Sequence, residues 1–374
     1  MTRLRALLVL LLACLLLGGC AAGATADPAD EGCDRMPLQY AENFTVDRYA
    51  NGAYLLTLGG QERFWLLPEG TEIPKGQDAQ IPVIRQPVER IYLASSSVAD
   101  LFLQMDALDR VRFTSTSEAN WRLPEMQEAL QNGTLLYVGK YSAPDYETLL
   151  AENCGLAVEN TMILHNPETR EKLETLGLPV LLEYSSYEPH PLGRVEWIKL
   201  YGLLLGRLEE AEAFFDRQVE QLRQVETAET SGKTVAFFHI TSNGTVVVRK
   251  SADYVNRMIQ LAGGEPALYD LPQDDKALST VTIQMESFYA QARDADVLIY
   301  NSTVSGELER VDQLLQLSDL LADFRAVQNG QVWCTEQSMF QRTSAAAGMI
   351  ADIHAILAEQ AGDGETLQFL HRLK

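Results

Sequence analysis

Histidine, cysteine and serine often carry catalysis or hold metals, but in this chain they lack the spacing that either task needs. There is no Gly-x-Ser-x-Gly nucleophile elbow, Gly-x-Gly-x-x-Gly motif or Gly-x-x-x-x-Gly-Lys-Ser/Thr phosphate loop. A zinc or manganese site needs converging histidines and carboxylates. The histidines instead fall on unrelated segments, at His165, His190, His239, His354 and His371. We therefore expect no enzyme and no metal centre, and keep a Zn/Mn-binding protein as an alternative.

Aromatic and basic side chains occur in the loops that follow predicted strands, where open α/β sheets bind their ligands. Aromatic rings there could stack on a flat ligand, and cationic groups could pair with an anionic one. Each could instead have a surface or helix-capping role. The candidates for ligand binding are Tyr187, Trp121 and Phe340 for stacking, and Arg194, Arg342 and Lys140 for charge.

The N-terminus has the pattern of a bacterial lipoprotein signal. Arg3 and Arg5 precede an apolar run over residues 6–17, which is shorter than the roughly 20 residues of a membrane-spanning helix. Gly18-Gly19-Cys20 follows and resembles a lipobox, in which the cysteine carries the lipid after cleavage. An ordinary signal peptide with an incidental cysteine is the alternative. We expect an extracytoplasmic protein anchored to the cell membrane through lipid on Cys20.

The net charge excludes some kinds of binding partner, and the cysteines offer a possible disulfide. The chain has 30 basic and 52 acidic residues, a net charge of -22, which argues against nucleic-acid binding and against attachment to anionic lipid through basic patches. In an oxidising compartment, Cys33 and Cys154 could form a disulfide that ties the N-terminal segment to the body. Cys334 is predicted to lie in a buried strand.

The pattern of apolar residues changes along the chain. Residues 54–58 and 64–67 predict a β-hairpin around Gly59-Gly60, and prolines mark the next stretch as an extended surface segment. Continuous apolar strands then alternate with helices, which predicts parallel sheets covered on both faces. We expect a signal peptide (1–19), a flexible lipid-anchored tether (20–34), a β-rich decoration (35–88), an α/β lobe (89–191), a helical connector (192–230) and a second α/β lobe (231–374).

The order and spacing of several segments resemble the iron-complex and cobalamin-binding class of substrate-binding proteins of ABC importers. The resemblance covers about residues 89–360. It rests on Arg90-Ile91-Tyr92-Leu93, Asp145-Tyr146-Glu147-Thr148-Leu149-Leu150, Glu171-Lys172-Leu173-Glu174-Thr175-Leu176-Gly177, Leu205-Gly206-Arg207-Leu208-Glu209-Glu210-Ala211, Leu261-Ala262-Gly263-Gly264-Glu265, and Met285-Glu286 followed by Asp294-Ala295-Asp296-Val297.

This resemblance implies an α/β fold of the class III periplasmic binding protein type. Two lobes with central, mainly parallel sheets would be joined by a rigid long connecting helix, and the ligand would sit in the cleft. Such proteins dock one glutamate from each lobe into arginine pockets of the permease, and Glu147 and Glu286 match those positions. Alternatively, these acids only stabilise the first turns of their helices through the helix dipole.

The resemblance also implies the ligand and the partners. We expect a monomer without a resident cofactor, which delivers an iron–siderophore-type complex to an ABC permease and its ATPase. Cobalamin or another corrinoid, or haem, is the alternative ligand, and His190 could then be an axial ligand. Residues 33–88 exceed the family's minimal form, and the first loop, Ala94-Ser95-Ser96-Ser97, lacks the proline often found there.

Overall fold

The computed structural model describes residues 33–226, 230–268, 271, 280–360 and 367–374. The expected signal peptide, Cys20 and most of the expected tether lie outside the described residues. Within the described ranges, no helix is both long enough and apolar enough to cross a membrane.

The N-terminal segment forms a five-stranded sheet in the order β1-β2-β3-β4-β5. The predicted hairpin is confirmed: β3 and β4 are antiparallel, and Gly59 and Gly60 take φ values of +55° and +70° in the turn. The proline-rich stretch is not wholly on the surface, because β5 pairs with β4 and buries Ile84. The strands are β1 (Cys33–Arg35), β2 (Phe44–Tyr49), β3 (Tyr54–Leu58), β4 (Glu62–Leu67) and β5 (Val83–Arg85).

The first lobe contains the predicted parallel sheet, in the order β12-β11-β6-β7-β8. Its alternate residues pack into different cores: Ile91 and Leu93 face the large central cluster, and Tyr92 faces a second one. Both faces are thus buried, as continuous apolar strands require. The elements are β6 (Ile91–Leu93), α2 (Ala99–Gln104), β7 (Val111–Thr114), α3 (Pro124–Gln131), β8 (Leu136–Tyr137), β9 (Gly139–Lys140), β10 (Ala143–Pro144), α4 (Tyr146–Ala151), β11 (Leu156–Asn160), α5 (Pro167–Thr175) and β12 (Val180–Glu183).

The second lobe has a seven-stranded sheet in the order β16-β14-β13-β17-β18-β19, with β15 also paired to β13. Its central strands β13, β17 and β18 are parallel, and antiparallel strands extend it at both edges. The strands are β13 (Thr234–Ile240), β14 (Val246–Arg249), β15 (Glu265–Pro266), β16 (Thr280–Ile283), β17 (Val297–Tyr300), β18 (Val332–Thr335) and β19 (Leu370–Arg372). The helices are α8 (Tyr254–Leu261), α9 (Met285–Ala292), α10 (Val311–Leu317), α11 (Arg325–Gln328) and α12 (Ala346–Leu357).

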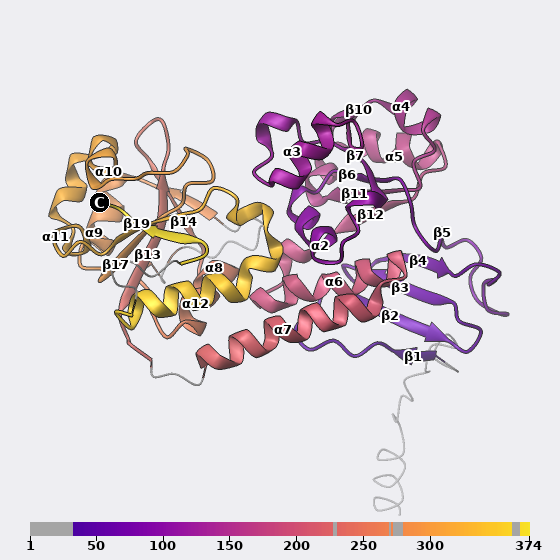
Figure 1. The fold of residues 1–374 in the computed structure, drawn as a ribbon, viewed down its shortest axis with the longest axis horizontal. Coiled ribbons are helices and arrows are strands. Elements are labelled where there is room, and N and C mark those ends of the chain that lie inside the picture. Colours follow the sequence, from indigo (N-terminus) through magenta and orange to yellow (C-terminus); the bar gives the residue numbers. More distant parts are fainter. Residues whose placement is uncertain (1–32, 227–229, 269–270, 272–279, 361–366) are drawn as a thin grey trace, which may run out of the picture.

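A pair of helices, α6 (Pro191–Leu205) and α7 (Leu208–Glu226), connects the lobes. Every residue of α6 is buried, and Gly206 ends it with a φ of +70° that favours glycine. The chain then reverses, and α7 runs beneath both lobes to reach α12 (Figure 1). The connector is therefore a packed helical pair rather than one helix, and one continuous core joins the N-terminal sheet, the first lobe and α12.

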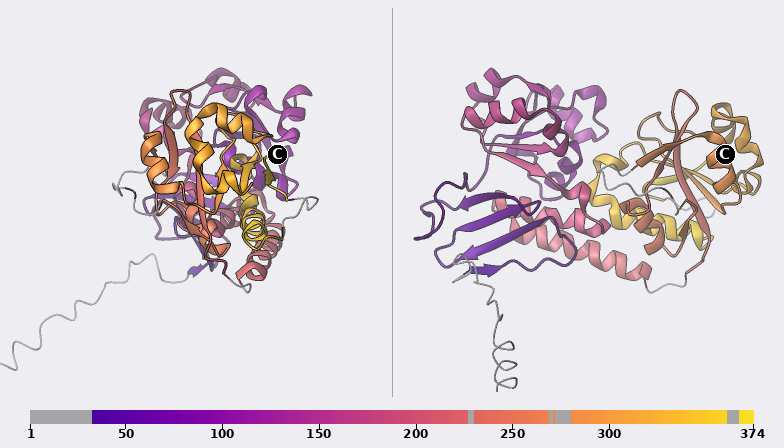
Figure 2. Two further views of the ribbon diagram at one scale, coloured as in Figure 1. Left: turned by 90° about the vertical axis from the view of Figure 1, so that its left-hand side faces the viewer. Right: turned by 180° about the vertical axis from the view of Figure 1, so that it is seen from behind.

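Two buried carboxylates attach the N-terminal sheet to α6. The Glu196 carboxylate, with no exposed surface, accepts the backbone N–H groups of Gln39, Tyr40 and Ala41 at 2.8–3.0 Å. It also accepts a hydrogen bond from Lys199 Nζ at 2.7 Å. The sheet lies against the connector at one end of the molecule, as the view from behind shows (Figure 2).

Glu188, just before α6, completes the attachment. It accepts the N–H groups of Glu42 and Asn43 at 2.8 and 3.0 Å, and the Trp197 indole N–H at 2.8 Å. Gly193 permits the close approach, because a Cβ there would lie 2.9 Å from the Tyr40 carbonyl oxygen. Five successive amides of the chain that enters the sheet are thus held by two side chains.

The expected Cys33–Cys154 disulfide is wrong. Cys154 is a free thiol in the second core of the first lobe, where Sγ donates to the Leu156 carbonyl at 3.6 Å. Burial raises the pKa of this thiol to about 12. Cys33 packs instead against a separate cluster under the N-terminal sheet. The glutamates, not a disulfide to Cys154, hold this sheet to the body.

We predict that Glu196→Gln lowers the free energy of unfolding by about 3–5 kcal/mol, because it leaves buried Lys199 without its charge partner and presents an N–H₂ group to backbone donors. Urea unfolding followed by circular dichroism measures this. Glu209→Gln, at an exposed position in α7, is the matched control and should leave the midpoint unchanged. Equal midpoints for both variants would contradict the role given to Glu196.

Candidate functional site

A small pocket of about 20 Å³ lies between the two halves of the molecule. It is formed by the start of α6, by α8 and by the segment that leads into α12. Three of the six residues predicted to bind ligand line it: Arg194, Phe340 and Arg342. The other lining residues are mostly apolar, namely Tyr254, Met258, Met339, Thr343, Ala345, Ala346 and Met349.

Arg194 is the most buried charged group of the pocket, with 9% of its surface exposed. Its guanidinium carbon lies 4.0 Å from the centre of the Tyr254 ring, which comes from the second lobe. Among the described residues, its Nε has no hydrogen-bond partner. The group therefore combines a cation–π contact with donor capacity that is free to meet an anion.

Glu183 lies buried at the end of β12 and interacts electrostatically with Arg194. Burial raises the pKa of Glu183, and hydrogen bonding from Ser185 and the positive charge of Arg194 oppose that rise. The Ser185 N–H donates to Glu183 Oε1 at 2.7 Å. The carboxyl group thus helps to keep a buried guanidinium at the pocket wall.

Arg342 and Phe340 come from the second lobe, in the loop after β18. Arg342 Nε donates to Ser338 Oγ at 3.3 Å, and its Nη1 lies 3.9 Å from Asp100 Oδ1 of the first lobe. The guanidinium carbon of Arg249 lies 4.8 Å from the centre of the Phe340 ring. With three methionines beside them, these groups suit a ligand that has both negative charge and an apolar or aromatic surface.

The lobes touch directly beside this pocket. Gln341 Oε1 accepts the Arg122 N–H at 2.7 Å, and Gln341 Nε2 donates to the Asn120 carbonyl at 2.9 Å. Thr343 Oγ1 donates to the Ser97 carbonyl at 2.6 Å, and the buried Asp100 carboxylate accepts the Ser344 N–H at 2.8 Å. The predicted serine loop of the first lobe therefore faces the second lobe.

The other three predicted ligand residues do not line the pocket. Trp121 is completely buried in the central core, so its predicted stacking on a ligand is wrong for this conformation. The ring turns inward because the loop before α3 has to cover that core. Lys140 is exposed on β9. Tyr187 is 43% exposed, and its hydroxyl lies 3.2 Å from Thr161 Oγ1.

His190 caps a helix in this structure. Its Nδ1 accepts the Leu192 N–H at 3.1 Å at the start of α6, and its ring stacks on Tyr40 with 4.4 Å between centroids. Burial, with a smaller effect from Arg257, lowers the pKa of His190 to about 4. Nδ1 therefore caps the start of α6.

Sequence reasoning missed two groups of residues. One is Tyr254 and the methionines of the pocket, which the sequence indicated only as part of amphipathic helices. The other is a set of exposed apolar side chains at or beyond the carboxyl ends of β8, β11 and β17, the edge at which open sheets bind ligands. Their exposed fractions are 47%, 50%, 52% and 70% for Tyr137, Met162, Leu164 and Val304.

Glu147 and Glu286 occupy equivalent places in the two lobes. Each is exposed and lies in the first turn of a short helix, α4 or α9, and these helices belong to different lobes (Figure 1). Asp145 caps α4 by accepting the Thr148 N–H at 3.1 Å. A first-turn acid suits the helix dipole, and exposure leaves both carboxylates available to a partner.

Comparisons with known proteins agree with this architecture. Residues 91–338 match the family model described as periplasmic binding protein. Two uncharacterized lipoproteins of Methanocaldococcus jannaschii are similar over most of the chain. One is 23% identical over 90% of this chain and 87% of its own length, and the other 21% identical over 89% and 84%.

Solved structures show the same fold. The periplasmic haem-binding protein HutB of Vibrio cholerae has a TM-score of 0.59 at 17% identity, covering 73% of this chain and 99% of its own. A periplasmic haem-binding protein of Pseudomonas aeruginosa has a TM-score of 0.58 at 17% identity, with 76% and 98% covered. The vitamin B12-binding protein BtuF of V. cholerae has a TM-score of 0.51 at 15% identity, with 74% and 99% covered.

The family match spans both lobes and the connector, and the fold neighbours share the two-lobed arrangement. Proteins of this family bind substrates for ABC importers and are not enzymes. This chain therefore belongs to the periplasmic binding protein family of the siderophore, haem and vitamin B12 type.

Proposed function

We propose that this protein is lipid-anchored through Cys20 and carries an anionic iron chelate of the siderophore type to an ABC permease. The observation that supports this most directly is the pocket between the lobes, in which Arg194 and Arg342 stand among methionine and aromatic side chains. The sequence of the N-terminus and the lipoprotein relatives support the anchor.

The charge of the pocket favours an anion. The chain as a whole carries a net charge of -22, so a pocket with the average charge of this protein would repel an anion. A ferric catecholate bears negative charge on oxygen atoms, which planar guanidinium groups bind through paired hydrogen bonds. The free donor capacity of Arg194 and the cation–π contact with Tyr254 suit this ligand class.

Haem is the second candidate, and a different observation favours it. The three pocket methionines and the exposed apolar side chains at the sheet edges suit a large flat macrocycle more than a polar chelate. Its propionates would also require the arginines. The names of the haem-binding fold neighbours agree with this candidate, and a corrinoid remains the third.

The ligand class is tested by titrating the full chain, in mild detergent, with a ferric catecholate, a ferric hydroxamate, haem and cobalamin while tryptophan fluorescence is recorded. We expect sub-micromolar quenching by the ferric catecholate, with haem the next strongest. Quenching by cobalamin alone, or by none of the four, would contradict an anionic iron chelate as the ligand.

The arginine contacts predict that Arg342→Gln weakens binding of the quenching ligand by a factor of about ten or more, because a charge-assisted hydrogen bond is lost. Equilibrium titration of the variant measures this. Arg223→Gln, in an exposed i,i+3 pair on α7, is the matched control and should bind like the parent. If Arg342→Gln binds as tightly as the parent, the ligand does not use this pocket.

Delivery to the permease is proposed to depend on Glu147 and Glu286. We expect Glu147→Ala and Glu286→Ala each to lower uptake of the ligand by cells, with unchanged affinity of the purified protein. This result is expected if the exposed carboxylates pair with guanidinium groups of the permease, because uptake then falls while ligand binding does not change. Glu210→Ala, also an exposed first-turn acid but on α7, should leave uptake unchanged. Loss of ligand affinity in either docking variant would contradict the assignment.

The connector predicts a small movement on binding. Because α6 is wholly buried and α7 packs against both α6 and α12, the lobes cannot swing widely about a flexible hinge. We expect ligand to loosen only the contacts between residues 341–344 and 97–122. Small-angle scattering with and without ligand should give nearly the same radius of gyration, and a large compaction or expansion would refute a rigid connector.

A further inference from the structure

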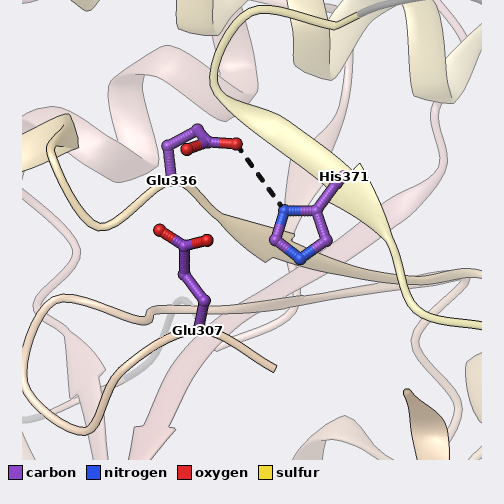
Figure 3. A group of neighbouring side chains, drawn as sticks. All are labelled: Glu307, Glu336 and His371. Carbon is purple, nitrogen blue, oxygen red and sulfur yellow. Dashed lines mark ion pairs between the residues drawn. The ribbon is translucent and has the colours of Figure 1, made fainter. Parts of the chain in front are cut away.

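A second group of chemically active side chains lies in the C-terminal lobe, away from the lining of the inter-lobe pocket. Among the described residues, Glu307, Glu336 and His371 can bring one ligand atom each to within 4.8 Å of one another. They point toward a common space between three separate segments (Figure 3). No sequence motif indicates this group, because its residues span more than sixty positions.

Sheet pairing explains the approach of two of these residues. In the antiparallel pair β18–β19, Cys334 lies opposite His371. Glu336 is two residues beyond Cys334, and its N–H still donates to the Phe369 carbonyl at 2.9 Å, so the ladder continues past the end of β18. Residues two apart on a strand share a face. Glu336 and His371 are therefore diagonal neighbours on one face.

The loop after β17 brings the third residue, and its backbone is fixed on both sides. The Leu308 N–H is held by Cys334 Sγ at 3.4 Å, and the Leu308 carbonyl accepts a hydrogen bond from His371 Nε2 at 2.8 Å. The adjacent Glu307 carboxylate accepts the Gln337 N–H at 2.7 Å. The donor atoms are thus positioned by backbone contacts outside the group itself.

The hydrogen bond to Leu308 also determines which histidine nitrogen is available. A carbonyl oxygen only accepts, so Nε2 must carry a proton and Nδ1 faces the carboxylates. Nδ1 lies 3.8 Å from Glu336 Oε1, which is too long for a direct hydrogen bond. A histidine that donates one N–H to a backbone carbonyl and presents its other nitrogen is the arrangement found at protein metal sites.

We propose that Glu307, Glu336 and His371 form a binding site for a divalent cation of the zinc type. One imidazole nitrogen and two carboxylates are a donor set that Zn²⁺ accepts, with a position left for water. In tetrahedral zinc coordination, bonds of about 2.0–2.1 Å place neighbouring ligand atoms about 3.3 Å apart. The three ligand atoms here lie within 4.8 Å of one another, so rotation of the glutamate side chains must bring them closer. Glu307 is exposed, which gives the ion access from solvent.

The surrounding charges favour a cation. Glu309 also interacts electrostatically with Glu336, so three carboxylates contribute negative charge at this place. Arg342 contributes one opposing positive charge. The site shares no lining residue with the inter-lobe pocket. The proposal therefore stands independently of the ligand that the pocket binds.

Titration of the full chain in detergent with zinc chloride, followed by isothermal calorimetry, tests the site. We expect one equivalent to bind with micromolar affinity, and Glu307→Gln, Glu336→Gln and His371→Gln each to weaken binding by a factor of about ten or more. His165→Gln, at an exposed histidine outside the group, should bind zinc like the parent. Absence of binding, or binding that survives all three substitutions, would overturn the proposal.

A second measurement separates loss of ligands from loss of fold. His371→Gln keeps an amide donor for the Leu308 carbonyl, so its thermal melting without metal should match that of the parent. Cobalt(II) should give visible absorption bands of a low-coordinate nitrogen–oxygen site in the parent, and these bands should be lost in His371→Gln. Bands that persist in this variant would show that His371 is not a ligand.

Discussion

The rest of this structure depends on two buried carboxylates, which accept hydrogen bonds from backbone N–H groups of the N-terminal segment. Glu196 and Glu188 accept hydrogen bonds from five successive backbone N–H groups where the N-terminal chain crosses α6. Buried charges of this kind are stable only when their hydrogen bonds are satisfied. Lys199 and the Trp197 indole supply the remaining donors. The contact therefore fixes where the sheet meets the connector.

Fixing α6 also fixes the pocket. The same helix that carries Glu196 begins with the turn that carries Arg194, and both lie within one fully buried segment. The second lobe supplies the rest of the pocket lining, including Tyr254, Phe340 and Arg342. Because α7 packs on both α6 and α12, helix packing rather than loop geometry places Arg194 relative to the pocket residues of the second lobe. The geometry of this pocket therefore requires a rigid connector.

Local patterns predicted the fold well, since each strand and helix depends mainly on residues near it in sequence. The hairpin at Gly59-Gly60 and the parallel strands of the first lobe are both of this kind. The first-turn positions of Glu147 and Glu286 were predicted equally well, and they place one exposed acid on each lobe.

Side-chain direction and long-range pairing could not be predicted in the same way. A loop aromatic such as Trp121 can face either the cleft or the core, and only the packing around it decides. Cys154 and Cys33 lie in different cores, which no spacing reveals. The meeting of His371 with Glu307 and Glu336 depends on the β18–β19 register, and the contacts of Glu196 depend on a chain crossing about 155 residues away.

Arg194 shows how the stability and the function of this molecule are linked. A guanidinium with 9% exposure and an unpaired Nε is costly to the empty protein, since an unsatisfied buried donor costs about 1–3 kcal/mol. Glu183 and the Tyr254 ring reduce that cost without using the donor. An anion that accepts from Nε removes it on binding, while a neutral ligand of the same shape does not. Under the proposed function, the pocket selects for negative charge because only an anion can accept from this unpaired donor.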